Sequence, residues 1–184
     1  ITFFGQDWGG SIGLYLLAQH PERFKRAIAA NTGIPIGLGA SEFFDMWLSM
    51  MEDATEFPWE QVFKPSFMEP LSEEALNGYM APFPGEEYQA GICSFPSLIP
   101  VLPDNPGVPL NKAAWEKLQT FDKPFLTLFG GKDPVTKGHE KILINNIPGA
   151  TGQAHKVYES ASHFIQEDAP EFLVGEISKF LDAS

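Results

Sequence analysis

Cysteine is nearly absent from this chain of 184 residues, in which Cys93 is the only one. A single cysteine cannot form a disulfide bond within its own chain, and no pattern of metal-ligating residues lies beside this one. We therefore interpret Cys93 as a small apolar residue. We expect the protein to work without a metal ion and without an organic cofactor.

Positive charge is also scarce. The chain has 12 lysine and arginine residues against 24 aspartate and glutamate residues, which gives a formal net charge of −12 at pH 7. Such a chain is a poor partner for nucleic acid or for an anionic membrane surface. It also lacks any apolar run near the roughly 20 residues that cross a membrane. We therefore expect a cytoplasmic domain with a real core, acting on a small neutral molecule.

The most informative segment is Gly-Gln-Asp-Trp-Gly at residues 5–9, which follows the apolar run 1–4 and precedes a helical pattern that ends near Pro21. It predicts a strand, a tight turn and a helix, with Asp7 in the turn. The glycines at both ends of the segment are expected to let backbone pass close to a strained turn. The setting resembles the nucleophile elbow of α/β hydrolases, whose nucleophile is usually serine. An aspartate there attacks saturated carbon and becomes an alkyl ester, which favours halides or epoxides over ordinary esters and amides.

An α/β hydrolase needs an acid and then a histidine further along the chain than its nucleophile. Asp133 lies just beyond the apolar run 124–129, which predicts a buried parallel strand, and sites of such sheets form at the carboxyl ends of their strands. His163 lies in a turn of small residues between a predicted strand at 155–159 and a predicted amphipathic helix at 169–182. The other histidines are interpreted as structural or solvated residues: His20, His139 and His155.

Several segments together resemble the haloalkane dehalogenases. They are residues 6–10, 81–84, 113–115, 123–126, 133–134 and 163–168, and the resemblance covers essentially the whole chain. The glutamine before the nucleophile, Gln6, resembles the pattern of the subfamily of the dichloroethane-degrading enzyme. Ser162 departs from the pattern, because the family usually has glycine before the histidine, although a small residue is retained.

The resemblance implies an α/β-hydrolase fold, a mostly parallel sheet flanked by helices, with a helical cap inserted into it. It implies that Asp7 displaces a halide and forms an alkyl ester, that His163 activates the water that hydrolyses this ester, and that Asp133 holds the histidine. The backbone N–H of Trp8 would be one donor of the oxyanion hole. The implied partners are a small neutral haloalkane, water and the halide product, and the full-length protein is expected to be a monomer.

The departing halide needs hydrogen-bond donors, and an indole N–H only donates. Trp8, next to the nucleophile, is the first candidate. The resemblance places a second tryptophan early in the cap, and Trp47 matches that place. Trp59 is a weaker candidate, and Trp115, on a predicted helix after the cap, is interpreted as a packing residue.

The chain divides into three predicted parts. Residues 1–32 form a core part with the elbow and a second strand at 27–31, residues 33–111 form the helical cap, and residues 112–184 return to the core. Further helices are predicted at 41–53, 72–80, 112–120 and 137–146. Cap phenylalanines are candidates for contact with an apolar substrate: Phe43, Phe44, Phe83 and Phe95.

An α/β hydrolase also needs strands beside the elbow strand and a loop that supplies a second oxyanion donor. The sequence opens on the elbow strand, and it contains neither those strands nor that loop. We therefore expect a partial sheet and the C-terminal part of a longer protein.

Three alternatives stay open. An epoxide hydrolase would use the same three catalytic residues, with Tyr79 and Tyr88 of the cap protonating the epoxide oxygen, and Trp47 favours the halide reaction over it. A non-catalytic relative would bind a ligand or a partner. The intact set of Asp7, Asp133 and His163 argues against this alternative. A fragment without its N-terminal strands would be catalytically incompetent.

Overall fold

The computed structural model describes residues 1–52, 54 and 56–184. Within them a parallel sheet runs in the order β1 (Thr2–Gln6), β2 (Arg26–Ala30), β3 (Phe125–Gly130) and β4 (Lys156–Tyr158). Gln6 pairs with Ala30, and Ala30 pairs with Leu128. Because these strands are parallel and in this register, the residues that follow them meet at one edge of the sheet.

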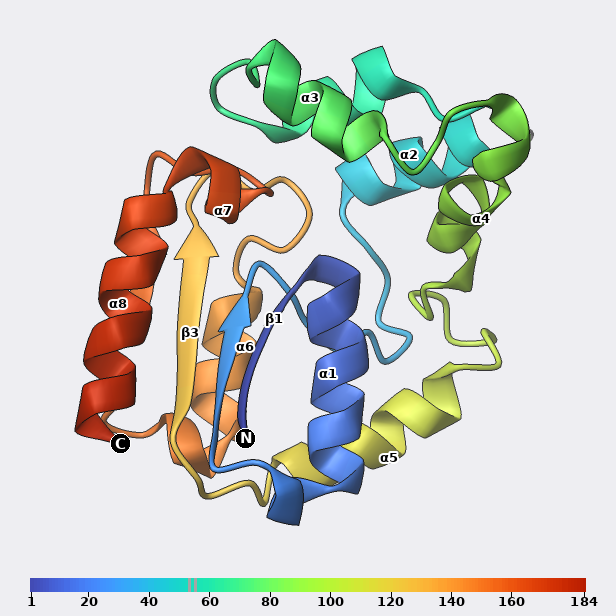
Figure 1. Cartoon of the computed structure of the whole chain (residues 1–184). Helices are drawn as coiled ribbons and strands as arrows, with labels where there is room; N and C mark the ends of the chain where they lie inside the picture. The colour runs from blue at the N-terminus through green and yellow to red at the C-terminus, as the bar shows by residue number, and fades with distance from the viewer. Residues whose placement is uncertain (53, 55) are drawn as a thin grey trace.

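Helices cover both faces of the sheet (Figure 1). Helices α1 (Asp7–Gln19), α5 (Val108–Leu118) and α6 (His139–Asn146) pack on one face. Helices α7 (Ile165–Asp168) and α8 (Pro170–Ala183) pack on the other. Alternate residues of a strand point to opposite faces, so that Ala27 and Ala29 belong to the first core and Ile28 and Ala30 to the second.

The chain between β2 and α5 forms a separate helical layer over the carboxyl edge of the sheet (Figure 1). It contains α2 (Glu42–Met51), a π-helical turn (Trp59–Phe63), α3 (Glu73–Met80) and α4 (Ala90–Leu98). We call residues 42–98 the cap segment. Ser41 and Ser72 accept hydrogen bonds from the backbone N–H of Phe44 and Ala75, which fixes where α2 and α3 begin. An aromatic cluster around Phe63 forms the core of this layer.

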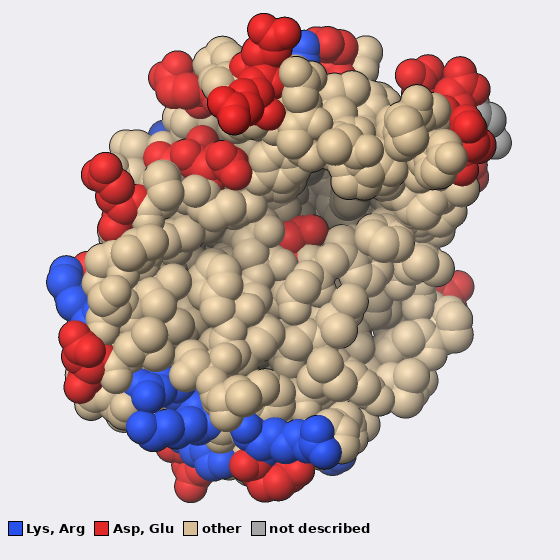
Figure 2. All heavy atoms as spheres, viewed as in Figure 1, with Lys and Arg blue, Asp and Glu red and all other residues tan. Residues whose placement is uncertain are grey.

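Charge is unevenly spread over the surface. Acidic side chains cover the outer side of the cap segment, basic side chains gather at the opposite end of the molecule, and mostly uncharged residues line the hollow between cap and sheet (Figure 2). In the part of the chain that the structure describes, no helix has the length and apolar character that a membrane span requires.

Most predicted elements are present, and the main differences concern three helices. Helix α5 begins at Val108, so the predicted boundary at residue 111 falls inside it. Helix α4 was not predicted, because it contains Gly91 and Pro96, which both disfavour helices. Short helix α7, directly after the loop of His163, was also not predicted. The last residue of the helix predicted at 41–53 lies outside the described residues.

The turn between β1 and α1 is strained. Asp7 has a backbone φ of 49°, in the left-handed region that side chains with a Cβ seldom adopt. A Cβ on Gly5 would lie 2.8 Å from the Cα of Gly10, and a Cβ on Gly10 would overlap the side chain of Thr32. A Cβ on Gly9 would meet no described atom within 4 Å, so the expectation that backbone passes close to the turn at Gly9 is wrong. Gly5 and Gly10 are the glycines that make the turn possible.

This geometry predicts opposite effects for two neighbouring glycines. Gly10→Ala should destabilise the fold by about 1–3 kcal/mol, because Thr32 must move to admit the methyl group. Gly9→Ala should be neutral or stabilise the fold by roughly 0.5–1 kcal/mol, since it removes a flexible residue from a helix. Urea unfolding of the two variants and the parent measures both. Equal losses of stability in the two variants would contradict this description of the turn.

Candidate active site

Asp7 is held at the edge of the sheet by its own backbone. Its N–H donates to the carbonyl of Asn31 (3.1 Å), and its carbonyl accepts from the hydroxyl of Thr32 (2.7 Å). Both partners follow β2, the neighbouring strand. The carboxylate stands at the first position of α1, and its side chain is 39% exposed. A carboxylate in this place is accessible and is favoured by the helix dipole.

His163 lies between two carboxylates. Its Nδ1 is 3.0 Å from Oδ1 of Asp133, and its Nε2 is 3.2 Å from Oδ1 of Asp7. The structure therefore brings together the three residues that the sequence proposed, from positions separated by as many as 156 residues. His155, by contrast, bonds to Thr127 and to the carbonyl of Ala150, which suits a structural role.

Asp133 is fully buried after β3. Burial by itself would raise the pKa of its carboxyl group. The hydrogen bond and the charge of His163, followed by bonds from the Thr136 hydroxyl and the Val135 N–H, outweigh it and hold this pKa below its usual range. Asp133 therefore stays ionised and can orient the imidazole.

Burial by itself would lower the pKa of His163. Its hydrogen bonds to Asp133 and Asp7, and the charges of both carboxylates, oppose this and raise the pKa to about 10. The imidazole is therefore protonated at neutral pH. Its positive charge depends on both neighbours, so a loss of either negative charge would make the ring easier to deprotonate.

Two tryptophans present buried N–H groups to the interior. The indole nitrogens of Trp8, at the start of α1, and Trp47, on α2, are buried and have no hydrogen-bond partner among the described residues. Phe95 packs on Trp8 and Phe44 on Trp47, with ring centroids 5.1 and 5.6 Å apart. A buried donor without an acceptor costs free energy, so these N–H groups are suited to a ligand that accepts hydrogen bonds.

The other two tryptophans lie in packed clusters. Trp59 packs edge-on against Phe57 and Phe63 and also contacts Phe83. Trp115 packs against the core between α1, α5 and the sheet. Neither indole nitrogen is among the buried, unpaired groups. Trp115 also lines the cavity beside Asp7. The lower rank of Trp59 and Trp115 as halide donors stays a prediction.

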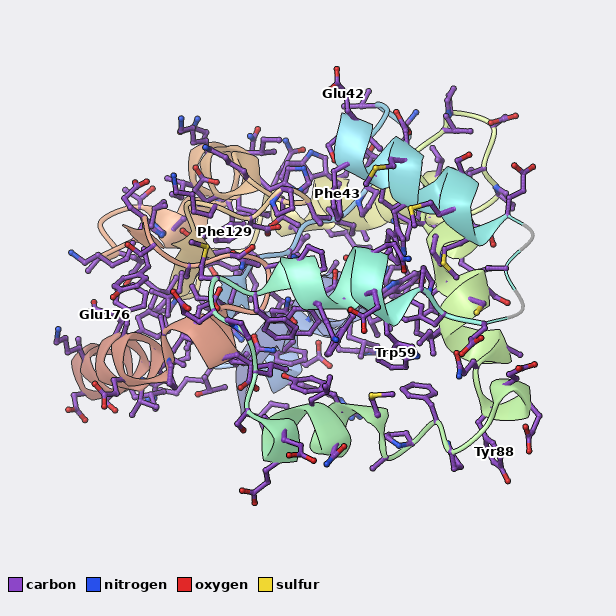
Figure 3. All side chains as sticks on the ribbon, turned by 90° about the horizontal axis from the view of Figure 1, so that it is seen from above. Glu42, Phe43, Trp59, Tyr88, Phe129 and Glu176 are labelled. Atoms are coloured by element: carbon purple, nitrogen blue, oxygen red, sulfur yellow. The ribbon has the colours of Figure 1, made fainter. Side chains whose placement is uncertain are left out.

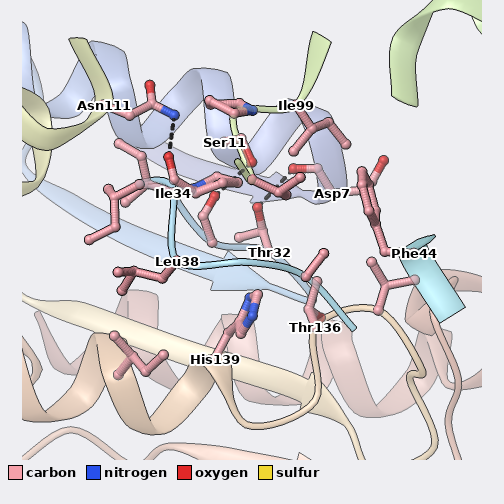
Figure 4. Close-up of a pocket in the computed structure, with 18 of the residues that line it drawn as sticks. Asp7, Ser11, Thr32, Ile34, Leu38, Phe44, Ile99, Asn111, Thr136 and His139 are labelled. Atoms are coloured by element: carbon pink, nitrogen blue, oxygen red, sulfur yellow. Dashed lines mark hydrogen bonds between the residues drawn. The ribbon is translucent and has the colours of Figure 1, made fainter. Parts of the chain in front are cut away.

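A cavity of about 720 Å³ opens beside Asp7. Its lining is mostly apolar, and Figure 4 shows Asp7 and Phe44 on one side of it and Asn111 and Leu38 on the other. Of the four predicted cap phenylalanines, Phe44 lines this cavity. Within the described residues no group of three or more His, Cys, Asp and Glu side chains is arranged to hold a metal ion. The cavity can therefore take an apolar molecule and present it to a carboxylate.

The cap tyrosines do not face this cavity. The hydroxyl of Tyr79 donates to Glu167 on α7 (2.7 Å), and burial together with this bond raises the pKa of Tyr79 to about 12. Tyr88 is exposed at the outer edge of the cap segment (Figure 3). A tyrosine bonded to a carboxylate and with a raised pKa is a poor acid for an epoxide oxygen.

Sequence reasoning missed several residues that hold the site together. The side chain of Asn31 donates to the carbonyl of Ser162 and to the carbonyl of His163. The hydroxyl of Thr136 donates to Asp133, and Asp168 accepts the N–H of Ser162. Asn31 had a detectable signal, because it is a polar residue directly after a buried strand, at the same sheet edge as Asp7. Thr136 had none, since its contact with Asp133 is fixed only by loop conformation. Asp168, the last residue of α7, lies in the segment 163–168 that carries the resemblance, but the sequence assigned it no contact.

The chain is similar in sequence to a known family model and to known proteins. Residues 1–90 match the family model of the α/β-hydrolase fold. The chain is 42% identical to a haloalkane dehalogenase of Psychrobacter cryohalolentis over 98% of its length, and 42% identical to haloalkane dehalogenase 1 of Mycobacterium bovis over 92%. The chain spans 60% and 56% of the lengths of these two relatives.

A solved structure agrees as well. The tetrameric structure of a haloalkane dehalogenase from Paraglaciecola agarilytica superposes with a TM-score of 0.83 at 27% identity, and the match covers 98% of this chain and 59% of that one.

The charge arrangement around His163 predicts a pH dependence of stability. The pKa rises from 6.5 to about 10 on folding, so the folded state holds a proton that the unfolded state releases between these values. The contribution of His163 to stability should be full below pH 6.5 and should be lost as the pH rises towards 10. Urea unfolding between pH 6 and 10 should show a downward slope in the parent, on the order of a few kcal/mol in total.

The slope should be much smaller in His163→Gln, which cannot carry the proton. His20→Gln is the matched control, because the side chain of His20 is 53% exposed and remote from the site. If His163→Gln keeps the parental slope, another group carries the dependence.

Proposed function

The chain belongs to the α/β hydrolases and is homologous to the haloalkane dehalogenases among them, and from this we propose that the complete protein hydrolyses haloalkanes to an alcohol and a halide ion. The observation that carries the proposal is an aspartate in the elbow, 3.2 Å from a histidine that is itself 3.0 Å from a second, buried aspartate. An aspartate nucleophile forms a carboxylic ester, which needs an activated water to release it.

The first step is displacement at carbon. The carboxylate of Asp7 attacks the carbon that bears the halogen, a C–O bond forms, and the C–X bond breaks with its electron pair leaving on the halide. His163 is not needed as a base in this step. The apolar cavity beside Asp7 supports binding of a small neutral haloalkane, since it removes water from the reacting carbon.

The first step also changes the pKa of His163, the residue that acts in the second step. Alkylation removes the negative charge of Asp7, one of the two charges that raise the pKa of His163. The pKa then falls, the imidazolium gives its proton to solvent, and the neutral ring becomes a base. The histidine thus becomes active only when there is an ester to hydrolyse.

Water completes the cycle. Nε2 of His163 takes a proton from water, whose oxygen attacks the ester carbonyl of Asp7. The N–H of Trp8 lies at the second position of α1, where a backbone donor has no partner within its own helix, and it stabilises the oxyanion. The tetrahedral intermediate collapses, the alkoxide leaves and takes the proton from His163, and the acid formed on Asp7 returns a proton to the ring. The sum is RX + H₂O → ROH + X⁻ + H⁺.

Halide rather than epoxide chemistry is favoured by the indoles. Trp8 and Trp47 each carry a buried N–H with no partner among the described residues, and a halide ion is an acceptor that both can serve. The epoxide reaction instead needs an acid, and Tyr79 is engaged with Glu167. We assign halide binding to Trp8 and Trp47.

Three further expectations stay predictions. The division into a core and a cap is supported by the separate aromatic core of the cap segment. A monomeric full-length protein stays a prediction, and a related solved structure is a tetramer. A cytoplasmic location also stays a prediction.

Substitution of the base should trap the intermediate. In the complete protein, His163→Gln should form the ester on Asp7 but fail to hydrolyse it, because attack needs only the carboxylate. Intact-mass spectrometry after addition of 1,2-dibromoethane should show a stable adduct, and steady halide release should fall by roughly 100- to 10,000-fold. Asp7→Asn should form no adduct, and His20→Gln should turn over normally. Steady turnover by His163→Gln would refute the role assigned to the histidine.

Substitution of either indole donor should weaken halide binding. Trp8→Phe and Trp47→Phe each remove a donor to a charged ligand, worth roughly 1.5–3 kcal/mol, or about 10- to 100-fold in the Kd for bromide. Quenching of tryptophan fluorescence by bromide measures it. Trp59→Phe is the matched control, since its ring lies in the aromatic cluster. Parental binding by Trp47→Phe would show that another group holds the ion.

A further inference from the structure

Asn31 is a polar residue that combines complete burial with a left-handed backbone conformation. It directly follows β2, is completely buried, and has a backbone φ of 38°. Asparagine tolerates this left-handed conformation better than most residues. A buried amide must also find partners for its donors and its acceptor, so that its surroundings are informative about its role.

The side chain of Asn31 uses its full donor capacity on the loop of His163. Nδ2 donates to the carbonyl of Ser162 and to the carbonyl of His163, each at 2.8 Å. An amide nitrogen has two hydrogens, and both are therefore engaged. Fixing the carbonyls before and at His163 restricts the backbone on both sides of its Cα, and so fixes the direction in which the imidazole leaves the chain.

The same residue contacts the two segments that carry the carboxylates. Oδ1 accepts the N–H of Gly130 at the end of β3, three residues before Asp133 (2.7 Å). The backbone carbonyl of Asn31 accepts the N–H of Asp7 (3.1 Å). A Cβ on Gly130 would lie 2.5 Å from the carbonyl oxygen of Ser162, so glycine is what allows β3 and the histidine loop to approach this closely.

We propose that Asn31 is a positioning residue that sets His163 against Asp7 and Asp133, and that it serves the hydrolysis of the ester more than its formation. The proposal rests on the proposed function. Ester formation needs the carboxylate of Asp7. The backbone N–H of Asp7 donates to the backbone carbonyl of residue 31, and any side chain at residue 31 leaves this bond in place. Ester hydrolysis needs the imidazole in register with both carboxylates, and this depends on the amide.

A backbone bond from the N–H of Lys132 to the carbonyl of Ala161 (2.9 Å) also joins the acid segment to the base loop, but no neighbouring side chain duplicates the amide. Gln6 donates to the carbonyl of His163 (3.0 Å), and Asp168 accepts the N–H of Ser162 (2.6 Å), but neither reaches β3. Among these three side chains, Asn31 alone joins the acid segment to the base loop. A displacement of about 1 Å in a reacting group can cost about 100-fold in rate, so that a small loop shift would be measurable.

The experiment separates the two chemical steps in the complete protein. Asn31→Gly removes the amide and accepts the positive φ, and Asn31→Ser keeps one donor at reduced reach. Thr127→Val is the matched control, because Thr127 is equally buried on β3 but its hydroxyl bonds to His155, away from the base loop. Rapid quenching after mixing with excess 1,2-dibromoethane, followed by intact-mass spectrometry, gives the rates of formation and decay of the ester on Asp7.

In Asn31→Gly the ester should form within about threefold of the parental rate and decay roughly 10- to 100-fold more slowly, so that it accumulates. Asn31→Ser should lie between this variant and the parent, and Thr127→Val should leave the ratio of the two rates unchanged. Equal slowing of both steps in the Asn31 variants, unchanged decay, or failure of both variants to fold would overturn the proposal, because the residue would then be merely structural or dispensable. A parental protein that forms no ester would instead refute the proposed function.

Discussion

Parallel pairing of β1, β2 and β3 is the constraint on which the rest of the site depends. Each strand ends at the same edge, and each is followed by a residue of the proposed site: Asp7 after β1, Asn31 after β2, and Asp133 in the loop after β3. The fourth contributor, His163, follows β4 in the same way. The strands form a rigid scaffold, so the short loops that follow them are enough to position each side chain.

Burial gives this group of residues its chemical character. His163 and Asp133 are removed from water, so that the charges of the carboxylates act strongly on the imidazole and raise its pKa to about 10. A buried positive charge that depends on two negative neighbours responds to the loss of either one. The proposed ester on Asp7 is such a loss, which links the first chemical step to the readiness of the base for the second.

The cap segment is tied to the base loop as well as to the substrate side of the cavity. Tyr79 bonds to Glu167, and the N–H of Met68 donates to Asp168, whose other oxygen accepts the N–H of Ser162. Phe164, next to the histidine, stacks on Phe67 at 4.6 Å. The cap segment therefore contacts the residues directly around His163, and one of these contacts occupies the hydroxyl of Tyr79.

The sequence by itself predicted most of the helices and strands and the order of nucleophile, acid and histidine along the chain. The elbow pattern, the apolar run before Asp133 and the small-residue turn at His163 are local signals, because strand, turn and helix preferences are properties of a few neighbouring residues. Tertiary structure alone decided the rest. Gly10 rather than Gly9 lacks room for a Cβ because Thr32, which follows a different strand, lies against it, and α4 forms despite Gly91 and Pro96. Three features depend on which groups meet in the folded chain and on how little water reaches them: the indole donors without a partner in the described part of the chain, the raised pKa of His163, and the contacts of Asn31. The spacing of residues along the sequence encodes none of them.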